Sequence, residues 1–163
     1  MRWLRSFYWS GAISILTADK TGRTPLPWAA SYGREEMVKM LLERKDVSPD
    51  MPDERGRAPF WWAVIYGHAE FMMTLLEWDN VDPDAADNSG RTPLSCAVEN
   101  REVEAMEILL KRSDVNPDSA DEKGRTPLSW ASSSGDDKIV QMLLDQNDAN
   151  PDAADVWGRT PLS

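Results

Sequence analysis

The chain has 163 residues, of which 41% are hydrophobic, so its composition is that of a folded protein with a substantial core and not of a disordered one. The formal net charge of -10 argues against nucleic-acid binding and against attachment to anionic membranes, because contacts to phosphate depend on Lys and Arg. Cys96 is the only cysteine, which excludes an internal disulfide and fits a reducing, cytoplasmic or nuclear compartment.

Residues 1–18 allow two interpretations. Arg2 and Arg5 precede a mostly apolar run, as they would in a secretory signal, although small polar residues interrupt the run. Counting back 34 residues from the segment 37–43 gives the segment 3–9, whose apolar residues then fall on the same positions. We therefore favour a partial repeat, made of a lone second helix, over a signal. No stretch approaches the roughly 20 apolar residues that are needed to cross a bilayer.

A phrase of eight residues returns through the chain at intervals of 34 residues. It reads GRTPLPWA, GRAPFWWA, GRTPLSCA and GRTPLSWA, and the chain ends in GRTPLS. A fixed period of a few tens of residues predicts stacked units that bury a shared core. The expected units, called repeats one to five here, are 19–52, 53–86, 87–120, 121–154 and the incomplete 155–163.

Each repeat begins with Asp-x-x-Gly, which favours a hairpin tip, because Asp caps nearby amides and Gly adopts a positive φ at little cost. Thr and Pro follow at the positions typical of a helix N-cap and a first helical residue. That Thr stands at 24, 92, 126 and 160, and Ala58 replaces it in repeat two. The first helix is expected to end at Gly33, Gly67 and Gly135. In repeat three, Asn100 or Arg101 should adopt the left-handed conformation instead.

A second amphipathic helix is predicted after each of these turns, as in EEMVKMLLERK at 35–45. Its apolar residues fall three and four apart, so they lie on one face and should form the core. The expected core positions are Val38, Leu41 and Leu42, then Met72, Leu75 and Leu76, then Met106, Leu109 and Leu110, and finally Val140, Leu143 and Leu144.

Helix, turn, helix and extended hairpin, with the phrase TPL-x-x-A, resemble the ankyrin repeat, whose usual unit has about 33 residues and carries T-P-L-H-x-A. The resemblance covers nearly the whole chain. The extra residue lies in the connectors DVSPD, NVDPD, DVNPD and DANPD, and together with GRTPLSWA it looks like the arrays common in fungal proteins. The resemblance implies an all-α solenoid of helix-turn-helix units joined by β-hairpin tips. It also implies a non-catalytic module that binds a protein.

Few residues are candidates for chemistry. His68 is the only histidine and follows a turn glycine, where it is expected to make a structural hydrogen bond. Cys96 takes the place of a tryptophan and is interpreted as a small core residue. Asp82, Asp84 and Asp87 are a candidate calcium group, but the twelve-residue loop ending in Glu is missing. We therefore predict no catalytic, cofactor or metal site.

The partner-binding surface is expected on the concave face, where the tips and the exposed ends of the first helices meet. Trp61 and Tyr66 are the expected aromatic anchors, because binding hot spots are rich in aromatic residues and Arg. Two alternatives remain open: the arginines that follow each tip glycine pair with tip aspartates, and Trp61 packs against its neighbours. The candidate residues are Arg23, Tyr32, Arg55, Arg57, Trp61, Ile65, Tyr66, Arg91 and Asn100.

Three classes of function compete. An autonomous adaptor and the sensing or recruiting arm of a larger multidomain protein, such as a nucleotide-switch receptor, are both consistent with the repeats, whereas a small enzyme has little support. Ser163 ends the chain before repeat five is complete, so the helices of repeat four have no predicted cover. The sequence thus predicts a piece of a longer array or end-to-end self-association, with a frayed natural end as the alternative.

Overall fold

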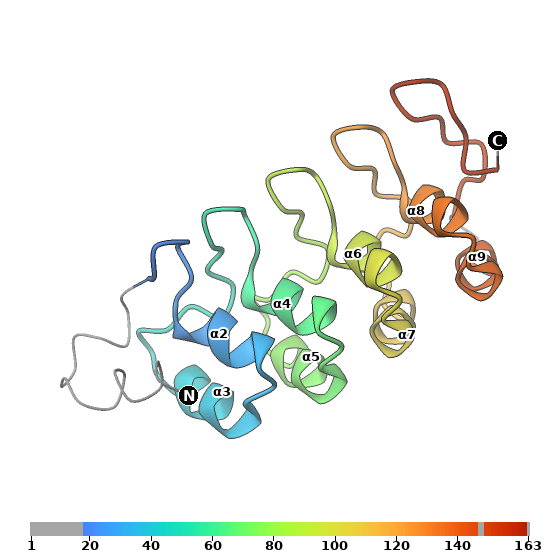
Figure 1. Ribbon diagram of the computed structural model, residues 1–163. Helices are drawn as coiled ribbons and strands as arrows, with labels where there is room; N and C mark the ends of the chain where they lie inside the picture. The colour runs from blue at the N-terminus through green and yellow to red at the C-terminus, as the bar shows by residue number, and fades with distance from the viewer. Residues whose placement is uncertain (1–17, 147–148, 163) are drawn as a thin grey trace.

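The computed structural model describes residues 18–146 and 149–162, which form an elongated stack of helix pairs (Figure 1). The first helices of the repeats are α2 (Pro25–Ser31), α4 (Pro59–Ile65), α6 (Pro93–Asn100) and α8 (Pro127–Ser134). The second helices are α3 (Glu35–Leu42), α5 (Ala69–Leu76), α7 (Val103–Leu110) and α9 (Asp137–Leu144). The all-α solenoid is confirmed. The lone helix predicted for 1–18 lies, apart from Ala18, outside the described residues.

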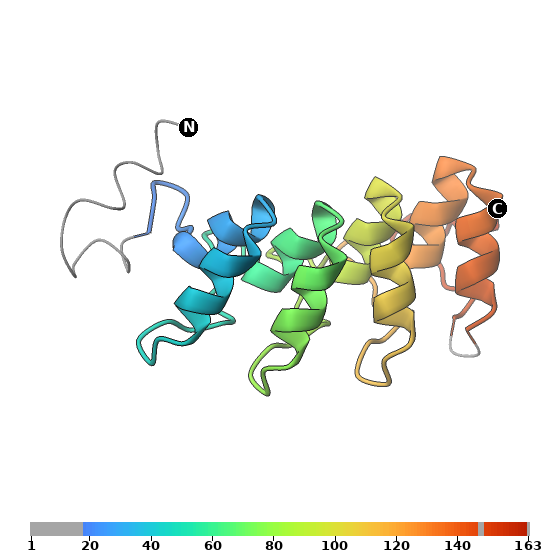
Figure 2. The ribbon, with the colours of Figure 1, turned by 90° about the horizontal axis from the view of Figure 1, so that it is seen from below.

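The helices form two layers, and the tips project from only one of them. In Figure 1, α2, α4, α6 and α8 lie side by side beneath the tips, and the second helices lie on the opposite side. Figure 2 shows the second helices as an array from below. Successive first helices contact one another, as α2 and α4 do, and each also packs against the second helix of its own repeat. The tips and the first helices therefore share one face of the molecule.

Each tip is closed by its aspartate. In repeat two, the Oδ1 of Asp53 accepts hydrogen bonds from the backbone amides of Arg55 and Arg57, at 2.9 and 3.1 Å. The amide of Gly56 donates to the carbonyl of Asp53, and Gly56 has a φ of +79°, which a residue with a Cβ adopts only under strain. No residue in the described ranges belongs to a β-strand, so the tips are tight turns and not paired strands.

Neighbouring tips are linked by one backbone hydrogen bond at each step of the stack. The bonds run from the amide of one tip to the carbonyl of the preceding tip, 33 residues earlier in the numbering, and keep successive tips in register. They join Glu54 to Thr21 at 3.1 Å, Asn88 to Arg55 at 2.8 Å, Glu122 to Ser89 at 3.0 Å and Val156 to Lys123 at 2.9 Å.

The predicted threonine caps form in only some repeats. The hydroxyl oxygens of Thr92 and Thr126 each accept a hydrogen bond from the amide three residues later, at 3.3 Å. Thr24 makes no such bond, because the residue three positions later is Pro27, which has no N–H. Ala58 has no side chain that can cap α4, as expected. Thr24 therefore occupies the N-cap position of α2 as predicted, but without the side-chain hydrogen bond.

The turns between paired helices follow the prediction. Gly67 has a φ of +64°, and Gly33 and Gly135 adopt similar values. In repeat three, Arg101 takes the left-handed conformation with a φ of +60°, while Asn100 remains the last residue of α6. A non-glycine residue is thus accommodated there at a modest cost in free energy.

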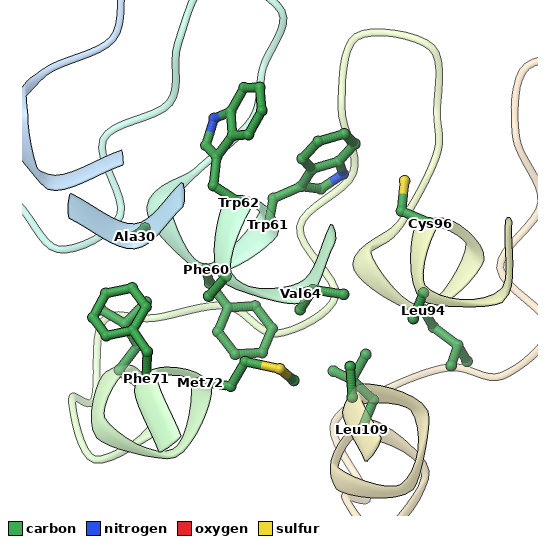
Figure 3. Close-up of a cluster of buried hydrophobic side chains, with 14 of the residues drawn as sticks. Ala30, Phe60, Trp61, Trp62, Val64, Phe71, Met72, Leu94, Cys96 and Leu109 are labelled. Carbon is green, nitrogen blue, oxygen red and sulfur yellow. The ribbon is translucent and has the colours of Figure 1, made fainter. Parts of the chain in front are cut away.

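The apolar stripe of the second helices forms the core together with the first helices. In Figure 3, Phe60 points from α4 toward Phe71 and Met72 of α5, and Leu94 faces Leu109 of α7. The predicted core positions are buried or half-buried with one exception. Leu144, at the end of α9, is 38% exposed, because no further helix pair in the described residues packs against that side.

The connectors bring carboxyl groups together. Burial and the neighbouring Asp82 raise the pKa of Asp50 to about 6, and the Oδ1 of Asp50 is buried without a hydrogen-bond partner. A pKa raised in the folded state means that this group stabilises the fold below its unfolded pKa near 4, and that this contribution is lost as the pH rises through 6. At neutral pH the ionised Asp50 is therefore destabilising.

Replacing Asp50 by Asn is expected to raise the free energy of unfolding at pH 7 by about 1 kcal/mol, since Asp50 keeps partial contact with water. The gain should disappear toward pH 4, where the carboxyl is protonated in the folded state. Urea denaturation at the two pH values measures the effect. Asp152→Asn, at the exposed equivalent position of repeat four, is the control. Equal effects of the two changes at pH 7 would contradict the explanation.

Candidate partner-binding face

The structure separates the nine predicted binding residues into three groups. Tyr32, Arg55, Tyr66 and Asn100 are exposed, and the two tyrosines are 64% and 52% accessible. Arg23, Ile65 and Arg91 are half-buried, whereas Arg57 and Trp61 are buried. The exposed residues come from the tips or from the ends of the first helices, on the face described above.

Trp61 is not the exposed anchor that the sequence suggested. Its side chain is 2% exposed, and its ring makes an edge-to-face contact with Trp62, with the ring centroids 5.5 Å apart. The Cζ atoms of Arg57 and Arg91 lie 5.1 and 6.0 Å from the centroid of the Trp61 ring. The alternative interpretation, that Trp61 packs against its neighbours, therefore describes this residue. Figure 3 shows Trp61 and Trp62 on the tip side of α4, opposite Phe60.

The arginines that follow the tip glycines pair with the aspartates of their own tips. The Nη2 of Arg57 lies 2.9 Å from the Oδ2 of Asp53, and this carboxylate is almost fully buried. The same pairs form between Arg91 and Asp87, Arg125 and Asp121, and Arg159 and Asp155, at distances of 3.0, 2.7 and 2.7 Å. In these four repeats the arginine forms an ion pair within its own tip, which is the first of the two alternatives given above.

Repeat one is different. The Oδ2 of Asp19 accepts a hydrogen bond from the indole Nε1 of Trp28 at 2.9 Å, so it does not pair with Arg23. The Nε of Arg23 donates instead to the hydroxyl of Thr21 at 3.1 Å, and Arg23 forms no ion pair within the described residues. Burial by itself would raise the pKa of Asp19. Hydrogen bonds from Thr21, Arg23 and Trp28 outweigh this effect and hold the pKa below its ordinary value. Asp19 therefore stays negatively charged, and its Oδ2 is hydrogen-bonded to Trp28 rather than to Arg23.

Arg23 lies at the centre of a row of stacked rings. Its Cζ atom is 4.2 Å from the ring centroid of Trp28 and 4.6 Å from that of Trp62. Tyr32 stacks on Trp28 and Tyr66 stacks on Trp62, at centroid distances of 5.9 and 6.0 Å and interplanar angles of 12° and 16°. We call these five residues the aromatic row. Each Tyr follows its Trp by four residues, so the helical turn of α2 and α4 produces both stacks.

Sequence reasoning missed several residues of this face. Trp28 is half-buried and Trp62 is buried, and neither was among the nine predicted residues, yet their rings carry the stacks that hold Arg23, Tyr32 and Tyr66. Val156 and Trp157 of repeat five were also missed, although they are 63% and 60% exposed. The signal was available in the sequence, because the two residues between the tip Asp and Gly are polar or charged in repeats one to four and apolar only there.

Charge is distributed unevenly between the two layers. In the sequence, acidic and basic residues balance in the tips and first helices, whereas Asp and Glu are in excess in the second helices and connectors. Within the first layer, only the segment 19–32 has more Lys and Arg than Asp and Glu. The face that holds the aromatic row therefore lacks the acidic excess of the chain as a whole.

The residues considered for chemistry have structural environments. The Nε2 of His68 lies 3.2 Å from the carbonyl oxygen of Ser31, which is the structural hydrogen bond expected. Cys96 is buried in α6, and burial raises the pKa of its thiol to about 12. In the ranges 18–146 and 149–162, His, Cys, Asp and Glu form no group of three or more placed to hold a metal ion. In those ranges, none of the helices is both long and apolar enough to span a membrane.

The comparisons with known proteins agree with the fold. The family model described as "Ankyrin repeats (3 copies)" matches residues 45–119, and the one described as "Ankyrin repeat" matches residues 21–54 and 123–156. The chain therefore belongs to the ankyrin-repeat family. A search of curated proteins found no match to the chain. The finer resemblance to arrays in fungal proteins stays a prediction.

Proposed function

We propose that the chain binds a protein partner through the face formed by its tips and first helices, and that the aromatic row is the centre of that contact. Ankyrin repeats are protein–protein interaction modules. The observation that carries the proposal is the pair Tyr32 and Tyr66, which are more than half exposed although each stacks on a tryptophan. Rings held rigidly by packing lose little conformational entropy on binding.

The double change Tyr32→Ala with Tyr66→Ala tests this proposal. We expect the dissociation constant for the native partner to rise about tenfold or more, because two aromatic anchors are removed. The partner is first identified by affinity capture from the native cell, and the affinity for the purified partner is then measured by titration calorimetry. Far-ultraviolet circular dichroism should show unchanged helix content, since both tyrosines lie outside the core.

A matched control is available on the opposite layer. Met40 of α3 and Met73 of α5 are 54% and 52% exposed and belong to the same two repeats. Met40→Ala with Met73→Ala removes exposed apolar surface without touching the aromatic row, so it should leave the affinity unchanged. Undiminished binding by the tyrosine variant, or an equal loss in the methionine variant, would place the contact elsewhere on the array.

Repeat five supports a second proposal, that the chain associates end to end. Val156, Trp157 and Leu162 are all exposed apolar residues at this end of the stack, and exposed apolar patches often mark interfaces. Replacing Val156 by Glu and Trp157 by Arg copies the tip of repeat two. We expect this variant to raise the dissociation constant for self-association about tenfold or more, measured by sedimentation equilibrium. Equal masses for variant and parent would contradict the proposal.

A further inference from the structure

The aromatic row contains an arginine, Arg23, that forms no direct ion pair within its own repeat. Of the five arginines that follow tip glycines, four pair with a tip aspartate and Arg23 does not. No other carboxylate in the described ranges forms an ion pair with Arg23, and residues 1–17 contain no Asp or Glu. Within the described ranges, Arg23 is therefore linked to a carboxylate only indirectly, because the hydroxyl of Thr21 bridges its Nε to the Oδ1 of Asp19.

The packing around Arg23 decides which of its atoms a partner can reach. The ring centroids of Trp28 and Trp62 lie 4.2 and 4.6 Å from the Cζ of Arg23, so both rings pack against the guanidinium. Its Nε is bonded to Thr21, whereas Nη1 and Nη2 have no hydrogen-bond partner within the described residues. The two terminal nitrogens point along the plane of the group, where an Arg binds a planar, two-oxygen acceptor best.

We infer that Arg23 is the receptor for a single carboxylate side chain of the partner protein, within a short segment whose neighbouring apolar residue packs against Tyr32 or Tyr66. This inference rests on the proposed function and names the chemistry of its partner. A carboxylate matches the two free nitrogens of the fork. Because the segment 19–32 alone carries a basic excess in the first layer, a partner carboxylate is favoured there over the other repeats.

Polyanions fit this site less well than one carboxylate does. Phosphate groups are usually bound by several cations together, and Lys20 is the only other basic residue in the segment 19–32. The excess of Asp and Glu in the second helices and connectors repels a long anionic chain. A short protein segment with one acidic residue and one apolar residue needs only one cation and is not strongly repelled by the acidic residues.

The test begins with selection of displayed random 12-residue peptides on the folded chain. We expect the enriched family to share an Asp or Glu at one fixed position, next to an aliphatic or aromatic residue. One peptide of that family is then synthesised together with a twin in which the acid is replaced by its amide. Fluorescence anisotropy gives the dissociation constants of both peptides. The parent chain should prefer the acid about tenfold or more, the usual scale for a charged hydrogen-bonded pair.

Variants of the chain separate Arg23 from the other arginines. Arg23→Gln should bind acid and amide peptides equally, and Arg23→Lys should keep only part of the preference, because Lys lacks the planar fork. Arg125→Gln is the matched control, since Arg125 stacks on Trp130 at 3.8 Å but is paired with Asp121. This control should keep the full preference. Circular dichroism checks that each variant is folded.

Three results would overturn the inference. They are an undiminished preference for the acid in Arg23→Gln, an enriched family without a fixed acidic position, and a selection that enriches nothing. In each case the double variant Tyr32→Ala with Tyr66→Ala tests the proposed function separately, because it measures the affinity for the native partner and does not depend on peptides. If that variant still weakens the partner while Arg23→Gln changes nothing, the face binds without a carboxylate receptor.

Discussion

Replacement of Trp61 by Ala is expected to lower the free energy of unfolding by about 3 to 5 kcal/mol, the usual cost of removing a large aromatic side chain from a core. The ring is 2% exposed and lies between Trp62 and the guanidinium groups of Arg57 and Arg91. Denaturation by urea, followed by far-ultraviolet circular dichroism, measures the loss. Trp61→Phe is the control and should cost far less, because the indole Nε1 of Trp61 is buried without a hydrogen-bond partner.

The size of Trp61 is explained by the residue at position 96. Repeats one, two and four have Trp at that place, whereas repeat three has the much smaller Cys96. At the place of Trp61, repeats three and four have Ser and repeat one has Pro27. Both Cys96 and Trp61 lie near Arg91. We infer that the side chain of Trp61 fills the space that a tryptophan at the place of Cys96 would fill.

A compensating pair of changes checks this explanation. Cys96→Trp alone should destabilise the chain by about 1 to 3 kcal/mol, because it adds a ring to a filled space. Adding Trp61→Ser to Cys96→Trp restores the pattern of the other repeats and should recover most of the loss. Additive losses in the double variant would mean that the two positions do not share the space.

Replacement of Leu109 by Ala is the other change with a large expected effect, about 2 to 5 kcal/mol, through the cavity left in a filled core. Leu109 has no exposed surface, and Figure 3 shows it beneath Leu94. Leu75→Ala, at the equivalent place in repeat two, should cost a similar amount, since stability in a stack of repeats is shared between neighbours. Val103→Ala, an exposed position in α7, is the control and should change stability by about 0.5 kcal/mol or less. If Leu109→Ala lowers the free energy of unfolding no more than Val103→Ala does, Leu109 does not belong to the core.

Most of the fold could be predicted because its determinants are local. The aspartate and glycine of each tip, the Thr-Pro helix start and the apolar spacing of the second helices all act within a few residues of one another. The left-handed Arg101 could be expected for the same reason, since the repeat needs a turn there whichever residue it has. Thr24 shows the limit even of local reasoning, because the proline three positions later decides whether its cap can form.

The binding face was predicted less well because it depends on contacts between repeats. We attribute the burial of Trp61 to the small residue at position 96, which belongs to a different helix. Arg23 differs from Arg57 and Arg125 although repeats one, two and four have the same Asp, Arg and Trp. The difference depends on whether the tryptophan or the arginine donates to the second oxygen of the tip aspartate. The residue types alone do not determine which of them does. Tyr32 and Tyr66 could be predicted, because helix ends on the tip side lie outside the core.

The stacks of arginine and tryptophan are distributed unevenly along the array. Arg23 joins repeat one to Trp62 of repeat two, and Arg91 of repeat three reaches back to Trp61. Arg125 and Arg159 stack only on tryptophans of their own repeats within the described residues. Arginine–tryptophan stacks therefore cross the boundaries between the first three repeats, whereas the hydrogen bond from Arg101 to the carbonyl of Ser134 crosses the boundary between repeats three and four. A partner that spans the whole face would meet repeats joined by aromatic stacks at one end and repeats joined by hydrogen bonds at the other.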